Sequence, residues 1–442
     1  MSNWQKVKIG DFLFERKGRY KPNYEQIVNL PRIEKIDFSG NFHIGNKDSK
    51  TDMILIKDGD LVISGINVAK GAMGIYSGED VTATIHYSSY TFDSNKINVE
   101  YFKRFLKSSE FIELLNEQVK GGIKTEIKPK HILPLEIQLP DINTQAQIVQ
   151  HFENVEDDIA DVTKEVLKQE SLLKKLKQTI LQEAIEGKLT AKWRAKNPDI
   201  GTAKELLEQI KTEKEKLVKD KKIKASKLLA PINEDEIPFD IPPSWEWCKF
   251  GEIIYENPRN GYSPKTVDYK TEIKTLKLGA ITQGYFDSTQ IKYLDIAIEK
   301  DSFLWLNKGD ILIQRSNSLE HVGMAGIYNL EDTNYIYPDL IMKCQVVQPV
   351  INYFIHKYLV SNFTREYFRN NASGAQQSMP KINQGTVTNL LVPLPPTEEQ
   401  KEIVATIEKL FTLCNELESE INQNKTTVDN LMVTVLKESF EN

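Results

Sequence analysis

The sequence predicts an α/β protein made of two copies of one unit. Two globular α/β domains occur in tandem, separated by two long helices that we expect to form an antiparallel coiled coil with pseudo-twofold symmetry. Two observations lead to this prediction: short motifs recur in the same order in both halves, and each half ends in a long apolar stripe with helical spacing. The expected parts are a first domain at 1–140, a first helix at 141–187, a basic helix and proline-rich linker at 188–244, a second domain at 245–395 and a second helix at 396–442.

The recurring motifs lie at matching places in the two halves. Trp4–Glu15 aligns with Trp245–Glu256, matching a tryptophan, a glycine, an acid and three apolar positions. Further on, Lys57-Asp-Gly-Asp-Leu-Val-Ile63 recurs as Asn307-Lys-Gly-Asp-Ile-Leu-Ile313. Short apolar runs of this kind predict strands, and helix-like stretches follow them in both halves. The repeat therefore predicts two α/β domains of one design.

The long apolar stripes have the spacing of a coiled coil. Their steps alternate between four and three residues, and equivalent positions stay 255 residues apart from 141 to 186. A stripe this narrow suits a two-helix seam better than the wider face of a helix on its own domain's core. The predicted seam consists of Ile148, Phe152, Val155, Ile159, Val162, Val166, Gln169, Leu173, Leu176 and Ile180, and of Ile403, Ile407, Leu410, Cys414, Leu417, Ile421, Asn424, Val428, Leu431 and Val435.

Local signals support both helices. Thr397-Glu-Glu-Gln400 has the pattern of a capping box at the start of the second helix, and Gly187 follows the first helix where a C-terminal glycine belongs. Gln169 and Asn424 occupy equivalent seam positions, where a polar side chain costs stability but can fix the register.

The stretch between the two units, 187–244, has no counterpart elsewhere in the chain. Thr202-Ala-Lys-Glu205 is a capping box that opens a charged helix. From 211 to 227, eight lysines and three acids leave a net charge of 8 − 3 = +5. A solvated helix face is the preferred interpretation, and a phosphate-binding arm is the alternative.

Composition excludes several classes of protein. The 442 residues contain 57 lysines and arginines against 63 acids, so any site for nucleic acid must be local. The three cysteines form no close pair, which argues against a disulfide framework and a CxxC metal knuckle and favours a reducing compartment. No signal core and no run of eighteen apolar residues is present. We expect a cytoplasmic protein with no membrane span.

The sequence also lacks the motifs of catalysis. There is no glycine-rich cofactor loop, no GxxxxGK[ST] phosphate loop and no Asn/Asp-Pro-Pro-aromatic tetrapeptide of the kind found in adenine methyltransferases. The six histidines fit no metal-ligand spacing. We therefore expect no catalytic residue, no metal site and no enzyme activity in this chain.

Three segments resemble one family, the specificity (S) subunit of Type I restriction-modification enzymes. They are the run at 392–404 with its partner in the first half, the Gly-Asp-Ile-Leu-Ile strand at 309–313, and Glu183–Arg194. Pro140-Asp-Ile-Asn-Thr-Gln145 departs from the family's Pro-Pro-x-x-Glu-Gln pattern, which leaves the capping residue of the first helix open.

The resemblance implies a role in DNA recognition. Two target recognition domains would each read half of a bipartite sequence in double-stranded DNA, with the paired helices as spacer. The chain would dock two modification methyltransferase subunits, and restriction motor-nuclease subunits would join for cleavage. No cofactor is implied for this chain, whereas S-adenosylmethionine, ATP and Mg²⁺ are implied for the partner subunits.

Three loops in each half carry the candidate DNA contacts. Lysine and arginine would mostly hold phosphates, whereas asparagine and glutamine are better suited to base edges, and arginine can also read guanine. In the first half the candidates are Arg16, Lys17, Arg19, Tyr20, Ser64, Asn67, Lys70, Lys124 and Lys128. In the second half they are Arg259, Asn260, Tyr262, Lys265, Arg315, Ser316, Asn317, Gln376, Gln377 and Lys381.

Two other functions stay open at this point. A coiled-coil scaffold with duplicated binding modules and no DNA ligand would suit the acidic composition. A modification enzyme whose motifs have diverged beyond recognition is the third hypothesis. A purified complex that does not distinguish DNA sequences would favour the scaffold hypothesis. Cofactor binding by the isolated chain would favour the enzyme hypothesis.

Overall fold

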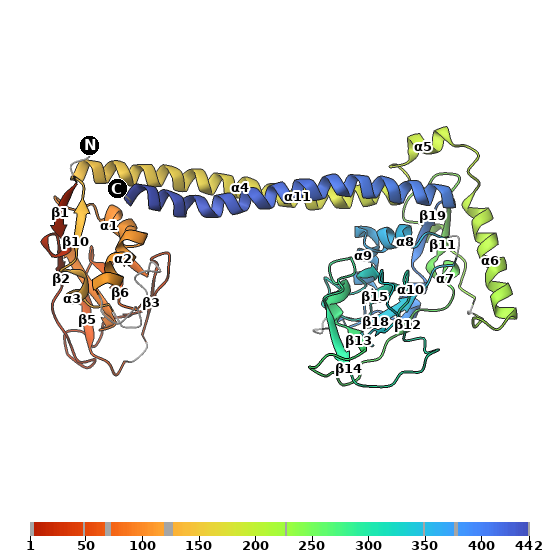
Figure 1. Ribbon diagram of the computed structural model, residues 1–442, viewed down its shortest axis with the longest axis horizontal. Coiled ribbons are helices and arrows are strands. Elements are labelled where there is room, and N and C mark those ends of the chain that lie inside the picture. The colour runs from red at the N-terminus through yellow and green to blue at the C-terminus, as the bar shows by residue number, and fades with distance from the viewer. Residues whose placement is uncertain are drawn as a thin grey trace. The chain divides into compact units, whose positions relative to one another are not determined.

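The computed structural model describes residues 4–46, 49–66, 72–118, 127–225, 228–347, 350–374 and 379–440. The chain divides into two compact units, one of residues 1–168 with 421–442 and the other of residues 169–420. Each unit contains small sheets, short helices and parts of both long helices (Figure 1). The predicted α/β class, with tandem domains and a coiled coil, is confirmed.

The described residues of the first unit form three sheets. Two four-stranded sheets have the orders β2-β9-β6-β7 and β4-β3-β8-β5, and β1 pairs with β10 in a separate two-stranded ribbon. The strands are β1 Gln5–Lys8, β2 Leu13–Glu15, β3 Arg32–Ile36, β4 Phe42–Gly45, β5 Met53–Ile56, β6 Leu61–Ser64, β7 Met73–Ile75, β8 Val81–Thr84, β9 Tyr87–Phe92 and β10 Glu136–Leu139. The short helices are α1 Val99–Phe105, α2 Ser109–Gln118 and α3 Pro129–Ile132.

The second unit repeats this plan. Its sheets have the orders β12-β18-β15-β16 and β14-β13-β17, with a β11–β19 ribbon. The strands are β11 Glu246–Lys249, β12 Arg259–Asn260, β13 Ile273–Leu276, β14 Ile291–Leu294, β15 Ile311–Gln314, β16 Ala325–Ile327, β17 Tyr335–Ile336, β18 Ile341–Cys344 and β19 Leu391–Leu394. The helices of its globular part are α7 Phe250–Ile253, α8 Asn352–Leu359, α9 Asn362–Asn370 and α10 Gln384–Thr388.

Strand registers show that the repeat is structural. In the ribbons, Gln5 pairs with Leu139 and Glu246 pairs with Leu394, the same positions that the sequence alignment equates. The Gly-Asp strands also correspond: β6 and β15 each pair antiparallel with the strand that follows, β7 and β16. The two domains are therefore two copies of one fold.

Two long helices follow the domains, α4 Ile142–Ile185 and α11 Thr397–Phe440. The side chain of Asp141 accepts hydrogen bonds from the backbone N–H of Asn143 and Thr144 at 3.0 and 3.1 Å, so it caps the first helix. Gly187, with φ 69°, ends it as predicted. The predicted capping box at Thr397 is wrong, because the Gln400 side chain is bound elsewhere.

A buried glutamine fastens each long helix to its own domain. The Gln145 Oε1 accepts from the backbone N–H of Asn98 at 2.7 Å, while its Nε2 donates to the carbonyls of Lys96 and Pro140 at 3.0 and 2.8 Å. Its counterpart Gln400 also uses both its Oε1 and its Nε2.

The Gln400 Oε1 accepts from the backbone N–H of Ile351 at 2.9 Å, and its Nε2 donates to the Pro395 carbonyl at 2.9 Å. Both glutamines are 0% exposed. Since α1 and α8 begin one residue after Asn98 and Ile351, the contact sets each short helix against the start of a long one.

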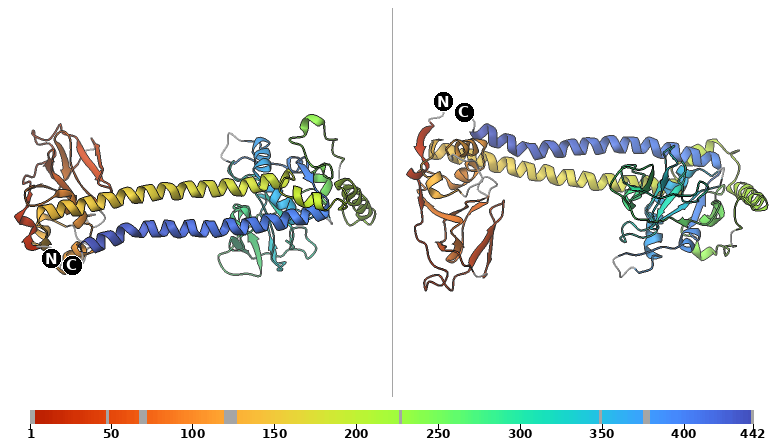
Figure 2. Two further views of the ribbon diagram at one scale, coloured as in Figure 1. Left: turned by 90° about the horizontal axis from the view of Figure 1, so that it is seen from above. Right: turned by 60° about the horizontal axis from the view of Figure 1, so that its bottom comes forward.

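The long helices pair antiparallel in each unit. In the first unit Val435 of α11 shares a core with Val149 and Phe152 of α4. In the second unit the Lys177 Nζ lies 2.8 Å from Glu418 Oε2, and Figure 2 shows these helix segments side by side in both views.

The predicted seam consists of two rows of residues, each repeating every seven positions. Only one of these rows is well buried. Its members Phe152, Val166, Leu173, Ile180, Ile407, Cys414, Ile421 and Val435 are buried, and Ile159 and Val428 are half-buried. The second row is buried at Ile403, half-buried at Ile148, Val155, Gln169 and Leu410, and exposed at Val162, Leu176, Leu417, Asn424 and Leu431. The two-helix seam is therefore narrower than predicted, and Asn424 does not occupy its interior.

The segment after α4 packs on the start of α11 within the second unit. Glu399 is 0% exposed and accepts hydrogen bonds from Trp245 Nε1 at 2.8 Å and Thr190 Oγ1 at 2.7 Å. It also pairs with the guanidinium of Arg194 in α5, Ala191–Lys196. A buried carboxylate with three donors of this kind is well compensated.

The basic helix of the linker is α6, Ala203–Lys219, and it begins with the predicted Thr202–Glu205 capping box. Ala203, Leu206 and Ile210 form its buried face. Within the described ranges, no helix is long and apolar enough to cross a membrane.

Replacement of either glutamine anchor should destabilise its own unit. Gln145→Ala or Gln400→Ala leaves buried backbone groups without partners, at a cost of about 2–4 kcal/mol in the free energy of unfolding. Denaturant unfolding measures this loss. Gln147→Ala is the matched control, since Gln147 is an exposed residue of the same helix. Equal stability of the Gln145 and Gln147 variants would contradict the anchor role.

Candidate nucleic-acid interface

The predicted loops of the second unit meet at one edge of its four-stranded sheet. At the end of β15, the Arg315 N–H donates to the Leu340 carbonyl at 2.8 Å, just before β18 begins. The Ile382 N–H donates to the Arg315 carbonyl at 2.9 Å, which brings Lys381 to the same edge. After β12, the Tyr262 N–H donates to the Tyr337 carbonyl at 2.9 Å. Backbone hydrogen bonds thus unite segments far apart in sequence.

Several side chains at this edge are available to a ligand. Tyr262 is 52% exposed, and Lys265 and Lys381 are also exposed. Arg315 is half-buried, and its guanidinium forms no ion pair with any residue that the structure describes. The edge therefore offers an aromatic ring, two ammonium groups and a guanidinium.

Two other predicted contacts support the loop. Ser316 is 0% exposed, and its hydroxyl donates to the Pro380 carbonyl at 3.2 Å, so its side chain does not reach the surface. The Asn317 Nδ2 donates to Gln314 Oε1 at 2.9 Å, and its Oδ1 accepts from the Ser318 N–H at 2.7 Å. The burial of Ser316 contradicts its predicted DNA contact, because this short loop satisfies its own polar groups. Asn317 is half-buried, and its DNA contact stays a prediction.

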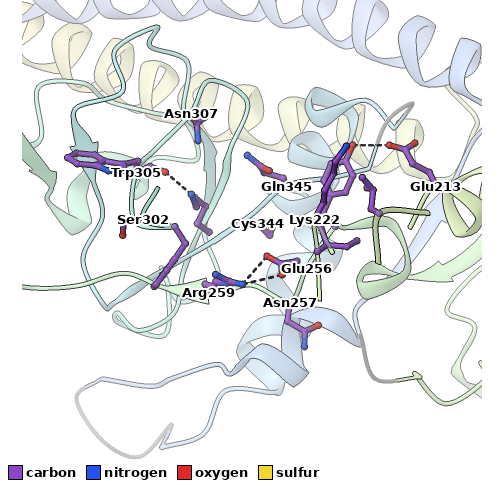
Figure 3. A pocket seen from close by; sticks show the side chains of 15 residues that line it. Glu213, Lys222, Glu256, Asn257, Arg259, Ser302, Trp305, Asn307, Cys344 and Gln345 are labelled. Carbon is purple, nitrogen blue, oxygen red and sulfur yellow. Dashed lines mark hydrogen bonds and ion pairs between the residues drawn. The ribbon is translucent and has the colours of Figure 1, made fainter. Parts of the chain in front are cut away.

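Arg259 and Asn260 form β12 and face a different environment. The Arg259 Nη2 lies 3.0 and 3.2 Å from the carboxylate oxygens of Glu256, and its guanidinium lies 5.1 Å from the centre of the Phe303 ring. Arg259 lines a pocket of about 450 Å³ together with Phe303 and Trp305 (Figure 3). The Asn260 Oδ1 is buried and has no hydrogen-bond partner within the described part of the chain.

A buried aspartate lies directly before β15 of the four-stranded sheet in the second unit. Asp310 is 0% exposed, and it accepts from the Asn307 N–H at 2.9 Å and from Gln345 Nε2 at 2.5 Å. The Lys343 Nζ lies 3.4 Å from the same carboxylate. Burial lowers the pKa of Lys343, and the negative charge of Asp310 opposes that shift.

The first unit has the equivalent aspartate with a different cation. Asp60 is 1% exposed and binds Arg16 in a bidentate pair, with Nε and Nη2 at 2.6 and 2.7 Å. The hydrogen bond to Asp60 raises the pKa of Arg16, against the effect of burial. Arg16 was predicted as a DNA contact, but its guanidinium neutralises a buried acid instead.

The sequence contained a signal for these two acids. A Gly-Asp pair stands before β6 and before β15, so Asp60 and Asp310 recur with the repeat. Residues that recur in both halves mark what the shared fold requires, whereas the side chains at the sheet edge differ between the halves.

The corresponding sheet edge of the first unit carries different side chains from that of the second unit. The Gly65 N–H donates to His86 O and the Ile127 N–H donates to Gly65 O, both at 2.8 Å. Gly65 thus occupies the place of Arg315. Ser64 is buried, and the exposed side chains are those of Lys17, Arg19 and Lys128.

The remaining predicted contacts divide into two groups. The Tyr20 ring lies 5.5 Å from that of Tyr24, and its backbone pairs with Met53. Asn67, Lys70, Lys124, Gln376 and Gln377 lie outside the described residues. No cluster of three or more potential metal ligands occurs within the described ranges.

Comparison with known proteins gives one consistent result. Residues 242–424 match the family model for the Type I restriction modification DNA specificity domain. The specificity subunit of the Type I restriction enzyme EcoEI from Escherichia coli is 30% identical over 269 residues, which cover 58% of this chain and 43% of that protein. The EcoAI specificity subunit from Escherichia coli is 26% identical, covering 90% of this chain and 75% of that protein.

Solved structures share the fold. A chain from a structure on complex assembly and conformational transition of the Type I R-M system has a TM-score of 0.66 at 14% identity, covering 99% of this chain and 97% of that one. The HsdS subunit from Thermoanaerobacter tengcongensis has a TM-score of 0.56 at 15% identity, covering 99% and 96%. The comparisons support the DNA-specificity hypothesis and not the scaffold alternative.

Proposed function

We propose that the chain is a specificity subunit of a Type I restriction-modification system, and that it selects the DNA sequence on which such a complex acts. Each globular domain would read one half of a bipartite target in double-stranded DNA. The matched segment spans less than half of the EcoEI subunit, so the assignment depends on this chain's own geometry as well.

The convergence of three loops at one sheet edge carries the proposal. Arg315, at the end of β15, has a guanidinium with no ion-pair partner among the described residues, and guanidinium groups suit the O6 and N7 acceptors of guanine. Lys381 is exposed beside it and suits a phosphate oxygen. Tyr262 adds an exposed ring at the same edge. A groove edge of DNA requires this mixture of charge and apolar surface.

We assign no chemical step to this chain. Methyl transfer would belong to two modification methyltransferase subunits that use S-adenosylmethionine, and cleavage to motor-nuclease subunits that use ATP and Mg²⁺.

Exposed leucines of the long helices suit the docking of a methyltransferase subunit. In the second unit, Leu172 and Leu176 are 54% and 44% exposed, and Leu413 and Leu417 are 50% and 46% exposed. In each pair, one leucine directly precedes a buried seam residue, Leu173 or Cys414, and the other follows it by three positions. The Lys177–Glu418 ion pair brings the Leu176 and Leu417 ends of the two pairs next to each other along the helices. In an antiparallel helix pair this spacing puts all four on one face, where a partner helix would cover them.

Methylation mapping tests the proposed function directly. Cells that carry this chain and its methyltransferase should show a bipartite methylated motif, and deletion of this chain alone should abolish it. A motif that persists after the deletion would contradict the proposal.

Two substitutions at the sheet edge should have different effects. Arg315→Ala should relax one position of one half-site and cost about 1–3 kcal/mol in binding the target, because a base contact is lost. Lys381→Ala should weaken binding to all sequences alike, because a phosphate contact carries no sequence information. The mapped motif and affinities for matched and mismatched duplexes separate the two. An unchanged motif in the Arg315 variant would contradict base reading there.

Charge on the leucine face should prevent assembly. Leu176→Lys with Leu417→Lys should greatly reduce recovery of the methyltransferase complex, because two ammonium groups would be buried against the partner. Size-exclusion chromatography of the co-expressed proteins measures this. Leu176→Gln with Leu417→Gln controls for loss of apolar area, and undiminished assembly of the lysine variant would exclude this face.

A further inference from the structure

The end of α6 presents a cluster of lysines that the proposed function leaves unused. Lys219, Lys221, Lys222 and Lys224, here called the lysine turn, are all exposed. None of their ammonium groups forms an ion pair with a residue that the structure describes. With Asp220 as the one acid between 219 and 224, the net charge is 4 − 1 = +3.

One of these lysines stands where a helix end favours glycine. The Lys221 N–H donates to Val218 O at 3.0 Å and the Lys222 N–H donates to Leu217 O at 2.9 Å, the two bonds of a Schellman motif. Lys221 has φ 57° and is the one non-glycine residue of the described chain with positive φ. The first long helix ends in the same motif with Gly187. A lysine at this position costs stability, and such strain points to a function.

The lysine turn is fixed to the second recognition domain. The Lys224 N–H donates to Glu256 Oε1 at 3.2 Å, and the same carboxylate pairs with Arg259 of β12. The Tyr255 hydroxyl donates to Glu213 Oε1 at 3.3 Å, which holds the body of α6 against this domain. Lys222 and Arg259 line one pocket (Figure 3). The lysine turn therefore adjoins β12 of the second domain, at a pocket that Glu213 and Glu256 also line.

We propose that the lysine turn binds the phosphodiester backbone of DNA next to the half-site read by the second domain. Ammonium groups suit phosphate oxygens as point charges and do not distinguish bases. The contact would add affinity without adding sequence information. This inference rests on the proposed function, which makes DNA the ligand of the second domain.

An acidic protein surface would also attract four lysines. The anchoring favours DNA, because Glu256 joins the turn to Arg259 of β12, a strand of the same sheet whose edge carries Arg315. Binding of phosphates by several lysines also has a distinctive signature, a steep dependence of affinity on salt.

The test compares two charge-matched variants in the complex with methyltransferase subunits. One carries Gln at Lys219, Lys221, Lys222 and Lys224. The control carries Gln at Lys192, Lys196, Lys204 and Lys211, four exposed lysines of the same unit. Fluorescence anisotropy gives the affinity for duplexes with and without the methylated motif, between about 50 and 200 mM KCl.

The lysine-turn variant should bind both duplexes about tenfold or more weakly, with a slope of log affinity against log salt smaller by about 2–4. Its methylated motif should stay that of the wild type. Affinity and slope equal to those of the control would overturn the inference, as would unchanged DNA binding combined with lost assembly of the complex. If the wild-type complex ignored DNA sequence, the proposed function would fail, whereas the lysine effect would still be measured on any duplex.

A single substitution separates the charge from the fold. Lys221→Gly relieves the positive φ, so it should raise the midpoint of thermal unfolding. It should also reduce the salt slope by about 1, because one phosphate contact is lost. A more stable protein with unchanged DNA affinity and slope would overturn the inference.

Discussion

The buried glutamine at the start of each long helix is the contact on which the rest of the structure depends. Gln145 and Gln400 each bind the backbone at the start of a short helix and the proline that follows the preceding strand. Because both side chains are inaccessible to water, these bonds cannot be exchanged cheaply for bonds to solvent. Each domain is thereby held in one orientation on its own helix. A reader of DNA needs this rigidity, since a recognition edge that pivots would lose its register on the bases.

A second constraint lies beneath the sheet edge. Asp60 and Asp310 stabilise equivalent turns before β6 and β15. Their basic partners lie on different elements, because Asp60 pairs with Arg16 after β2 and Asp310 with Lys343 in β18. The fold thus requires a buried acid and a compensating base, and it leaves the choice of base free. Above this shared layer the edge varies, with Gly65 in one unit where Arg315 stands in the other. One scaffold can in this way support two different binding surfaces.

Much of the fold could be predicted because the chain repeats itself. The recurring motifs predicted two domains of one design, and the β1–β10 and β11–β19 ribbons pair equivalent residues in the two halves. The residues of the candidate site were harder to predict, because the sequence does not show which acidic side chain will pair with a given basic one. Arg16 was predicted as a DNA contact but pairs with Asp60, 44 residues away. Ser316 is buried by a bond to Pro380 that no local pattern predicts. Nor did the basic composition of the linker reveal that Lys221 would adopt a positive φ.

The central claim is that each domain reads its own half-site on a common scaffold. Exchange of residues 245–395 for the corresponding domain of a specificity subunit with another target tests this most directly, with the methylated motif mapped in cells. The account predicts that one half of the bipartite motif changes to that of the donor while the other half stays as in the wild type. A motif unchanged in both halves, or changed in both, would contradict it.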